Sequence, residues 1–255
     1  MNSRKSFRDW LLPLLVAATV AWAPASHAQS DNIDPDAVSL LRKSTEYVGS
    51  LKRFRVDATS SIELVTTDMQ KLQFDHHVSI SVERPNRMRI DRVGEIVQQN
   101  FYYDGKSLAV SFPNDGFYAS VPAPAAIDAT LDLARDKLDV VAPGADFLYS
   151  NAFDRLSAGL TSARFIGEAT IAGVRCEHLA FRNAEVDWQI WIDEGDKPLP
   201  RKLVVTSKRM AQSPQFTVVM NKWDTSPKFS DAMWTFTPPK GARKIEWLPA
   251  SAAAK

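Results

Sequence analysis

Two long stretches of strict alternation between apolar and polar residues constrain the fold of this chain most. In residues 53–64 every second position is apolar or small, and the positions between them are mainly polar or charged. The same period of two runs through residues 71–83. Such alternation is typical of a β-strand with one buried and one solvated face, because successive side chains in a strand point to opposite faces. Both stretches are therefore predicted to be long strands of an antiparallel sheet.

Shorter apolar runs that are bounded by turn residues predict further strands. Asp104-Gly105 is a dipeptide typical of β-hairpins, and Ala172-Gly173 separates two alternating runs in the same way. With the two long strands, these runs give about ten or eleven antiparallel strands. The additional strands are predicted at 87–93, 95–103, 107–112, 117–121, 163–171, 175–182, 187–193, 201–209 and 215–223, with a brief further pairing at 233–236.

Three segments follow a helical period instead. Asp34 can cap a helix and Pro35 suits the first helical position, and the apolar residues that follow recur at helical spacing. We therefore predict an N-terminal helix over residues 35–49. Apolar residues at the same spacing in 127–138 and 149–160 predict two amphipathic helices in the middle of the chain.

These elements define an α+β fold class. No linker or shift in composition divides residues 29–255, so we expect them to form a single domain. Long strands joined by short turns favour one large curved antiparallel sheet. Each helix has an apolar stripe to bury, and the dry face of the sheet is the surface available for it. We therefore predict an unclosed half-barrel that is covered by the N-terminal helix and the two mid-chain helices.

Residues 1–28 have the pattern of a secretory signal. Basic residues precede an apolar run over residues 10–23, and the small residues Ser26 and Ala28 stand before the expected cleavage point. The run is shorter than the roughly 20 residues that a membrane span needs, which favours a cleaved signal over an uncleaved anchor. We expect the mature protein in a bacterial periplasm, without a stable membrane span.

Composition and missing motifs exclude several classes of function. The formal net charge of +1 gives no electrostatic reason to expect binding to nucleic acid. The single cysteine, Cys176, excludes an internal disulfide and any pair of closely spaced thiols. The chain contains no nucleophile elbow, zinc-protease motif, Walker loop or glycine-rich dinucleotide motif. We expect a protein that is not an enzyme and needs no cofactor, and a hydrolase is the less favoured alternative.

The adjacent residues His76 and His77 are the most tempting metal ligands. Neighbouring residues of a strand point to opposite faces, so these two side chains cannot readily hold one ion. We therefore predict no metal site. His76 belongs to the apolar set of its strand, where it is either a hydrogen-bonded core histidine or a polar group inside a cavity. The first of these alternatives is the more common one.

Three short motifs resemble a known family. Residues 188–193 (WQIWID) and 199–203 (LPRKL) resemble a strand, turn and strand of the LolA/LolB superfamily of periplasmic lipoprotein carriers, and residues 233–242 (MWTFTPPKGA) resemble its C-terminal ending. Within this superfamily the chain most resembles an uncharacterised periplasmic family, domain of unknown function 2092. The resemblance implies an unclosed barrel covered by helices that binds acyl chains, lipoproteins or other apolar molecules.

These observations lead to a hypothesis for the function. We expect a carrier or chaperone that holds an apolar small molecule or a lipidated protein between sheet and helices. The alternative is an envelope sensor or interaction module on the same scaffold, with an envelope protein as its partner. The sequence leaves open whether the interior is a cavity or a filled core. The expected wall of the cavity consists of Phe54, Val56, Ile62, Phe74, His76, Val78, Ile80, Leu131, Phe147, Phe153, Trp188 and Ile190.

Export provides the first testable prediction. Expression of the full chain in a bacterium should give a periplasmic protein whose intact mass corresponds to residues 29–255, because signal peptidase cuts after small residues such as Ala28. Mass spectrometry of the periplasmic fraction measures this directly. A product that retains Met1, or one found only in the cytosol, would contradict the prediction.

Overall fold

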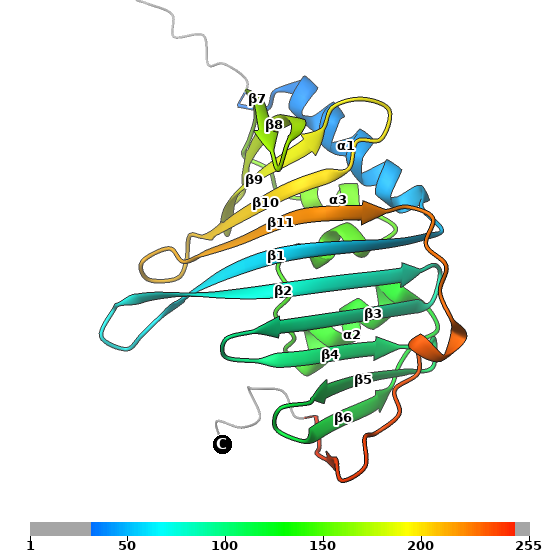
Figure 1. The fold of residues 1–255 in the computed structure, drawn as a ribbon. Coiled ribbons are helices and arrows are strands. Elements are labelled where there is room, and N and C mark those ends of the chain that lie inside the picture. The colour runs from blue at the N-terminus through cyan, green and yellow to red at the C-terminus, as the bar shows by residue number, and fades with distance from the viewer. Residues whose placement is uncertain (1–31, 248–255) are drawn as a thin grey trace, which may run out of the picture. The chain divides into compact units, whose positions relative to one another are not determined.

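The structure is a computed structural model that describes residues 32–247. The predicted signal segment and the residues after 247 lie outside the described part of the chain. Residues 32–247 form one twelve-stranded sheet together with three α-helices (Figure 1). The α+β class and the unclosed sheet that the sequence predicts are confirmed, and the sheet has slightly more strands than predicted.

The sheet consists of two meanders that meet in its middle. Its strand order is β12-β6-β5-β4-β3-β2-β1-β11-β10-β9-β8-β7, and every neighbouring pair is antiparallel except β12 with β6. The two meanders therefore join where β1 pairs with β11. The strands are β1 (Arg53–Val65), β2 (Lys71–Glu83), β3 (Arg87–Gly94), β4 (Gln98–Tyr103), β5 (Ser107–Phe112), β6 (Phe117–Pro122), β7 (Ser162–Ile171), β8 (Val174–Arg182), β9 (Val186–Asp193), β10 (Pro200–Ser207), β11 (Gln215–Asp224) and β12 (Arg243–Lys244).

The helices begin largely where the sequence predicts. Helix α1 (Pro35–Ser50) is capped by Asp34, whose side chain accepts a hydrogen bond of 2.9 Å from the backbone N–H of Asp36. Helix α2 (Ile127–Leu138) also matches its prediction. The third helix is shorter than predicted: only α3 (Ala152–Ser157) is α-helical, because Tyr149 is extended and ends a separate 3₁₀ turn, η1 (Ala145–Leu148). None of the helices within residues 32–247 is long and apolar enough to span a membrane.

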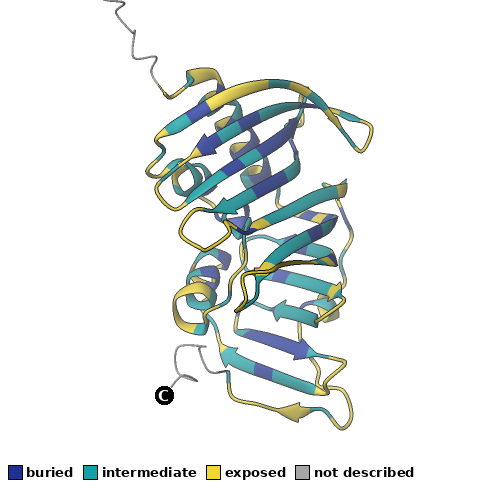
Figure 2. Cartoon of the chain, turned by 90° about the vertical axis from the view of Figure 1, so that its left-hand side faces the viewer, coloured by how far each residue is buried: buried dark blue, intermediate teal, exposed yellow. Residues whose placement is uncertain are grey.

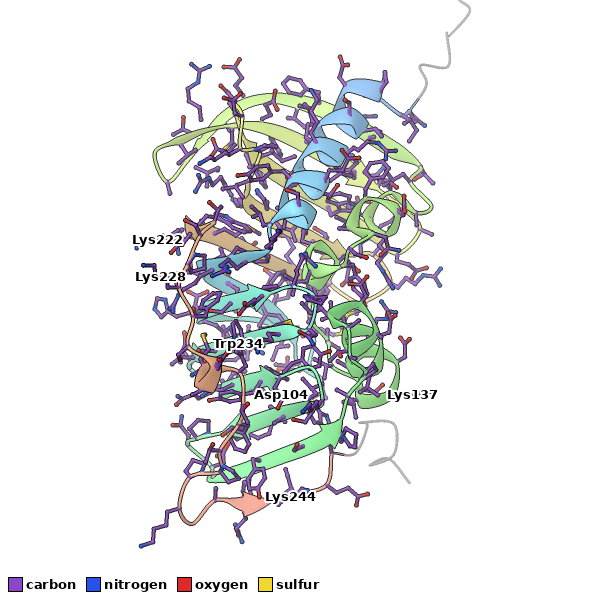
Figure 3. The ribbon with its side chains drawn as sticks, turned by 90° about the vertical axis from the view of Figure 1, so that its right-hand side faces the viewer. Asp104, Lys137, Lys222, Lys228, Trp234 and Lys244 are labelled. Atoms are coloured by element: carbon purple, nitrogen blue, oxygen red, sulfur yellow. The ribbon has the colours of Figure 1, made fainter. Side chains whose placement is uncertain are left out.

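The helices cover one face of the sheet, and the C-terminal segment runs along the other (Figures 1 and 3). This segment contains Trp234, which is fully buried and packs edge-on against Phe229. The prediction of a strand at residues 233–236 is wrong. Trp234 takes a helical backbone conformation after the 3₁₀ turn η2 (Asp231–Met233), and the segment pairs with β6 only at β12.

The two halves of the helix-covered face are filled differently. Over β7–β10 the side chains of α1 close a dense core, in which Leu41, Leu179 and Ile190 are fully buried. The other half has a second core cluster around Phe54, Tyr103 and the residues of α2. Figure 2 shows that buried residues lie along the strands, whereas the connecting loops are exposed.

Two glycines give a matched test of the packing. A Cβ at Gly94, at the end of β3, would lie 2.1 Å from His76 Cδ2 and 2.7 Å from the backbone oxygen of Asp75. We expect Gly94→Ala to lower the free energy of unfolding by about 1–3 kcal/mol, since the ring and the strand must shift. Gly49 of α1 has open space at its Cβ position, so Gly49→Ala should raise this energy by about 0.5–1 kcal/mol. Urea unfolding of both variants would test this, and unchanged stability of Gly94→Ala would contradict it.

Candidate ligand-binding pocket

A pocket of about 1120 Å³ lies between the β1–β6 half of the sheet and the helical segment that covers it. Inward-facing side chains of β1 to β5 and of β11 form its sheet wall, and α2 with the chain from 139 to 149 forms the opposite wall. Pockets that hold drug-sized ligands enclose about 300–1,000 Å³. This pocket therefore has room for a long ligand.

The pocket exists because this half of the sheet is incompletely covered. The large side chains Ile80, Ile90 and Phe101 line it and remain partly exposed, whereas Ile190 in the other half is fully buried. The segment between α2 and η1 lines the pocket without regular secondary structure, and its Val141 is 82% exposed. The sequence left open whether the interior is a cavity or a filled core. The structure has a filled core under α1 and an open pocket under α2.

A polar cluster fixes the helical wall. Asp132 of α2 accepts hydrogen bonds from Tyr149 Oη at 2.9 Å, from Arg135 at 2.9 Å and from Arg155 at 3.0 Å. Burial and the hydrogen bond to Asp132 raise the pKa of Tyr149 to about 12. These contacts tie α2 to α3 and to the end of η1, so the pocket is built between elements that are held together.

The structure places most of the predicted wall residues on this pocket, although their role in binding stays a prediction. Those that line it are Phe54, Val56, Ile62, Val78, Ile80, Leu131 and Phe147. Among the others, Trp188 and Ile190 belong to the filled core, and Arg42 of α1 covers the ring of Phe153 at 3.6 Å. Phe74 is partly exposed and pairs with Ile62 along β1 and β2, outside the pocket lining.

Sequence reasoning missed part of the wall. Met88 and Ile90 follow the alternation of β3, which is a signal that could have placed them there. Trp247 lines the same pocket, with its ring centre 6.4 Å from that of Phe101. No local pattern could have predicted Trp247, because it reaches the pocket only after the C-terminal segment has paired with the edge of β6.

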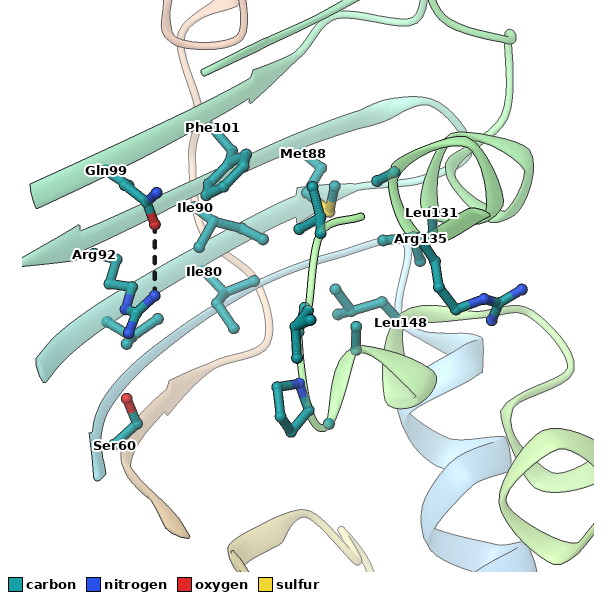
Figure 4. A pocket seen from close by; sticks show the side chains of 18 of the residues that line it. Ser60, Ile80, Met88, Ile90, Arg92, Gln99, Phe101, Leu131, Arg135 and Leu148 are labelled. Atoms are coloured by element: carbon teal, nitrogen blue, oxygen red, sulfur yellow. Dashed lines mark hydrogen bonds between the residues drawn. The ribbon is translucent and has the colours of Figure 1, made fainter. Parts of the chain in front are cut away.

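One end of the sheet wall is polar. Ser60, Arg92 and Gln99 line this end, whereas His76, predicted as a wall residue, is not among the residues that line the pocket. His76 is 2% exposed and lies opposite Gly94, whose missing side chain leaves space for the imidazole ring. Arg92 Nη2 is 2.8 Å from His76 Nε2, and Arg92 Nη1 donates to Gln99 Oε1 at 3.5 Å. Figure 4 shows Arg92 and Gln99 beside the apolar side chains of Ile80 and Ile90. His77 is exposed on the opposite face, as the alternation predicts.

The electrostatics of this end keep His76 neutral. Burial, together with the positive charge of Arg92, lowers the pKa of His76 below its ordinary value. Because a guanidinium group only donates hydrogen bonds, Nε2 of the neutral imidazole acts as the acceptor. Burial also lowers the pKa of Arg92. Both groups therefore lie in poorly solvated surroundings, with Arg92 in the wall of the pocket.

No metal-binding cluster is formed by the described residues. Among residues 32–247, no three His, Cys, Asp or Glu side chains are placed to hold a metal ion. Cys176 is fully buried, its thiol donates to the backbone oxygen of Val174 at 3.4 Å, and burial raises the pKa of the thiol. This environment is typical of a structural cysteine that is held as a neutral thiol.

The fold and the pocket define a class of protein in which an unclosed sheet encloses an apolar cavity against its helices. The family described as "Predicted periplasmic protein (DUF2092)" matches residues 37–248, so the chain belongs to this family. The family membership that the sequence motifs predicted is thereby confirmed, and the family's description agrees with the expected periplasmic location. No curated relative matches the chain in sequence.

Several solved structures resemble this fold at low sequence identity. An uncharacterized conserved protein from Thermus thermophilus matches with a TM-score of 0.50 and 9% identity, over 83% of this chain and 99% of that one. LprF from Mycobacterium bovis has a TM-score of 0.48 and 13% identity, over 82% and 99%. A LolA superfamily protein from Nitrosomonas europaea has a TM-score of 0.39 and 10% identity, over 78% and 97%. Such similarity concerns the fold and leaves function to be argued from the site.

Acid should weaken the folded state through His76. The unfolded chain binds a proton at His76 near its ordinary pKa of about 6.5, and the folded chain binds it only at lower pH. Below about pH 6.5 the unfolded state therefore holds more protons, and stability falls as the pH drops toward the folded pKa. We expect His76→Gln to reduce the loss of unfolding free energy between pH 7.5 and 5.5.

His178→Gln provides a parallel measurement. His178 lies on β8, away from the pocket, and its pKa is also lowered by burial, so it contributes a separate part of the acid dependence. Urea unfolding at both pH values is the measurement for each variant. Identical pH dependence in the wild type and in His76→Gln would show that the assignment to His76 is wrong.

Proposed function

We propose that this protein is a non-enzymatic periplasmic carrier that holds an apolar chain in the pocket between β1–β5 and α2. One observation carries the proposal: the large side chains of Ile80, Ile90 and Phe101, which are neighbours across β2, β3 and β4, face a space of about 1120 Å³ and remain partly exposed. A filled core would bury such side chains, as α1 does over the other half of the sheet. An apolar ligand would take the place of that missing cover.

The energetics are sufficient for useful binding. Burial of a methylene group gains about 0.8 kcal/mol, so a chain of sixteen carbons with about fifteen buried methylenes gains about 12 kcal/mol. Association costs at least about 4 kcal/mol in lost freedom of motion. The difference of about 8 kcal/mol corresponds to a dissociation constant near 1 μM. We therefore expect micromolar affinity for a single acyl chain, with weaker binding if the covering segment must move.

The alternative of an envelope interaction module is favoured by one observation. Strand β7 is the last strand of the sheet, and Phe165 and Ile166 on it are 42% and 52% exposed. Residues 32–34 cover the first part of this edge through Ala163 and Phe165, and within residues 32–247 the part of β7 after Phe165 carries no further strand. A sheet edge with exposed apolar side chains can accept a strand from another protein. A specific envelope partner captured by a parent protein that binds no apolar probe would favour this function over the carrier.

Obstruction of the pocket tests the carrier function. Ile90 of β3 faces the pocket, so the indole of Ile90→Trp should occupy space that the ligand needs. We expect Ile90→Trp to raise the dissociation constant of the neutral dye N-phenyl-1-naphthylamine about tenfold or more, because each 1.4 kcal/mol of lost contact is a factor of ten. Fluorescence titration, with displacement by hexadecanoylglycerol, is the measurement.

Val93→Trp is the matched control. Val93 lies on the same strand with its side chain on the opposite face, where it is 47% exposed, so the same indole there should leave dye binding unchanged. Urea unfolding checks that both variants fold. Absence of dye binding to the wild type, or equal binding to Ile90→Trp, would refute the carrier proposal.

A further inference from the structure

Arg92 is a cation placed among apolar side chains without an acidic partner. It lies on β3 opposite Val78 and lines the pocket together with Val78 and Ile90. Its hydrogen-bond partners, His76 and Gln99, are both neutral. Within residues 32–247, Arg92 makes no ion pair with a carboxylate.

Two other arginines of the same region have carboxylate partners. Arg89 lies three residues before Arg92 on the opposite face of β3 and pairs with Asp91 at 3.0 Å. Arg135, which also lines the pocket, pairs with Asp132 at 2.9 Å. Of the two arginines that line the pocket, Arg92 is therefore the one without a carboxylate partner. Because a poorly solvated charge is costly without a counter-charge, this position has unused capacity to bind an anion.

The sheet wall of the pocket has a polar end and an apolar remainder, whereas the charged lining residues Arg135, Asp139, Asp146 and Glu246 come from the helical segment and the C-terminal segment. Ser60, Arg92 and Gln99 lie at one end of the sheet wall, and Ile80, Ile90 and Met88 continue the wall from there. Leu131 and Leu148 face this apolar part from the helical side (Figure 4). A ligand that fits both regions has a polar head and an apolar tail.

We infer that the pocket binds an amphiphile with an anionic head group, whose carboxylate or phosphate oxygens accept hydrogen bonds from the guanidinium of Arg92 while its tail covers Ile80, Ile90 and Met88. This inference rests on the proposed carrier function and names the class of its ligand. The planar fork of an arginine side chain suits two oxygens of a carboxylate or phosphate group. Gln99 can donate an additional hydrogen bond from its amide nitrogen.

The test compares head groups on one constant tail. Four compounds with a single hexadecanoyl chain serve as competitors of N-phenyl-1-naphthylamine: hexadecanoate, hexadecanoylglycerol, lysophosphatidylglycerol and lysophosphatidylcholine. The first and third carry a net negative charge, hexadecanoylglycerol is uncharged, and the phosphate of lysophosphatidylcholine is neutralised by the choline of the same head group. We expect the anionic compounds to bind the wild type about tenfold more tightly than their neutral counterparts, because hydrogen bonds between charged groups are about twice as strong as neutral ones.

Variants then assign the preference to Arg92. Arg92→Gln should remove the preference for anions and leave binding of hexadecanoylglycerol nearly unchanged. Arg92→Lys keeps the charge without the fork, so it should keep part of the preference. Arg89→Gln is the control, since its side chain lies on the opposite face and pairs with Asp91. The comparison of head groups on the wild type needs no variant, so the inference stays testable even if Arg92→Gln fails to fold.

Each outcome decides between the two proposals. Tighter binding of hexadecanoate than of lysophosphatidylglycerol would identify a fatty acid as the source of the anion, and the reverse order a phospholipid. Equal binding of all four compounds would overturn the inference about Arg92 and leave the carrier function in place. Absence of binding by the dye and by all four compounds would overturn both. An anion preference that persists in Arg92→Gln would show that another group selects the head.

Discussion

The apolar face of the sheet is larger than its helices can cover, and the main features of the molecule follow from this mismatch. Twelve strands pair side by side in one open sheet. Helix α1 and the elements packed with it fill the face over β7–β10. The shorter α2 and the chain that follows it leave Ile80, Ile90 and Phe101 of β2–β4 only partly covered. The pocket is thus a consequence of incomplete burial, which an apolar ligand would complete.

A second constraint acts where the pocket becomes polar. The ring of His76 requires the empty space above Gly94, and the neutral ring in turn gives Arg92 a hydrogen-bond acceptor that carries no charge. A carboxylate in the place of His76 would neutralise Arg92 internally. The imidazole holds the guanidinium in position and leaves its charge unpaired, which is the arrangement that an anionic ligand needs. The space above Gly94 and the proposed selectivity of the pocket for anions are in this way physically linked.

Local patterns predicted much of the fold because they depend on neighbouring residues. The alternation in residues 53–64 and 71–83 gave strands close to their observed bounds, and Asp34 capped α1 as predicted. The same reasoning failed at Trp234, where burial against Phe229 favours a helical conformation over a strand. It also predicted too long a helix after η1, because the apolar spacing continues through Tyr149 although the backbone there is extended.

The sequence by itself determined which face of the sheet most strand residues occupy, since this depends on the period of two along a strand and is broken only at the register shifts between paired strands. It could not distinguish Ile80, which lines the pocket, from Ile190, which is buried in the core, because both are inward-facing residues of alternating strands. Only the tertiary structure decided this, through the position of α1 over one half of the sheet. It also decided that Arg92 meets His76 and Gln99 rather than a carboxylate, since those contacts join three different strands.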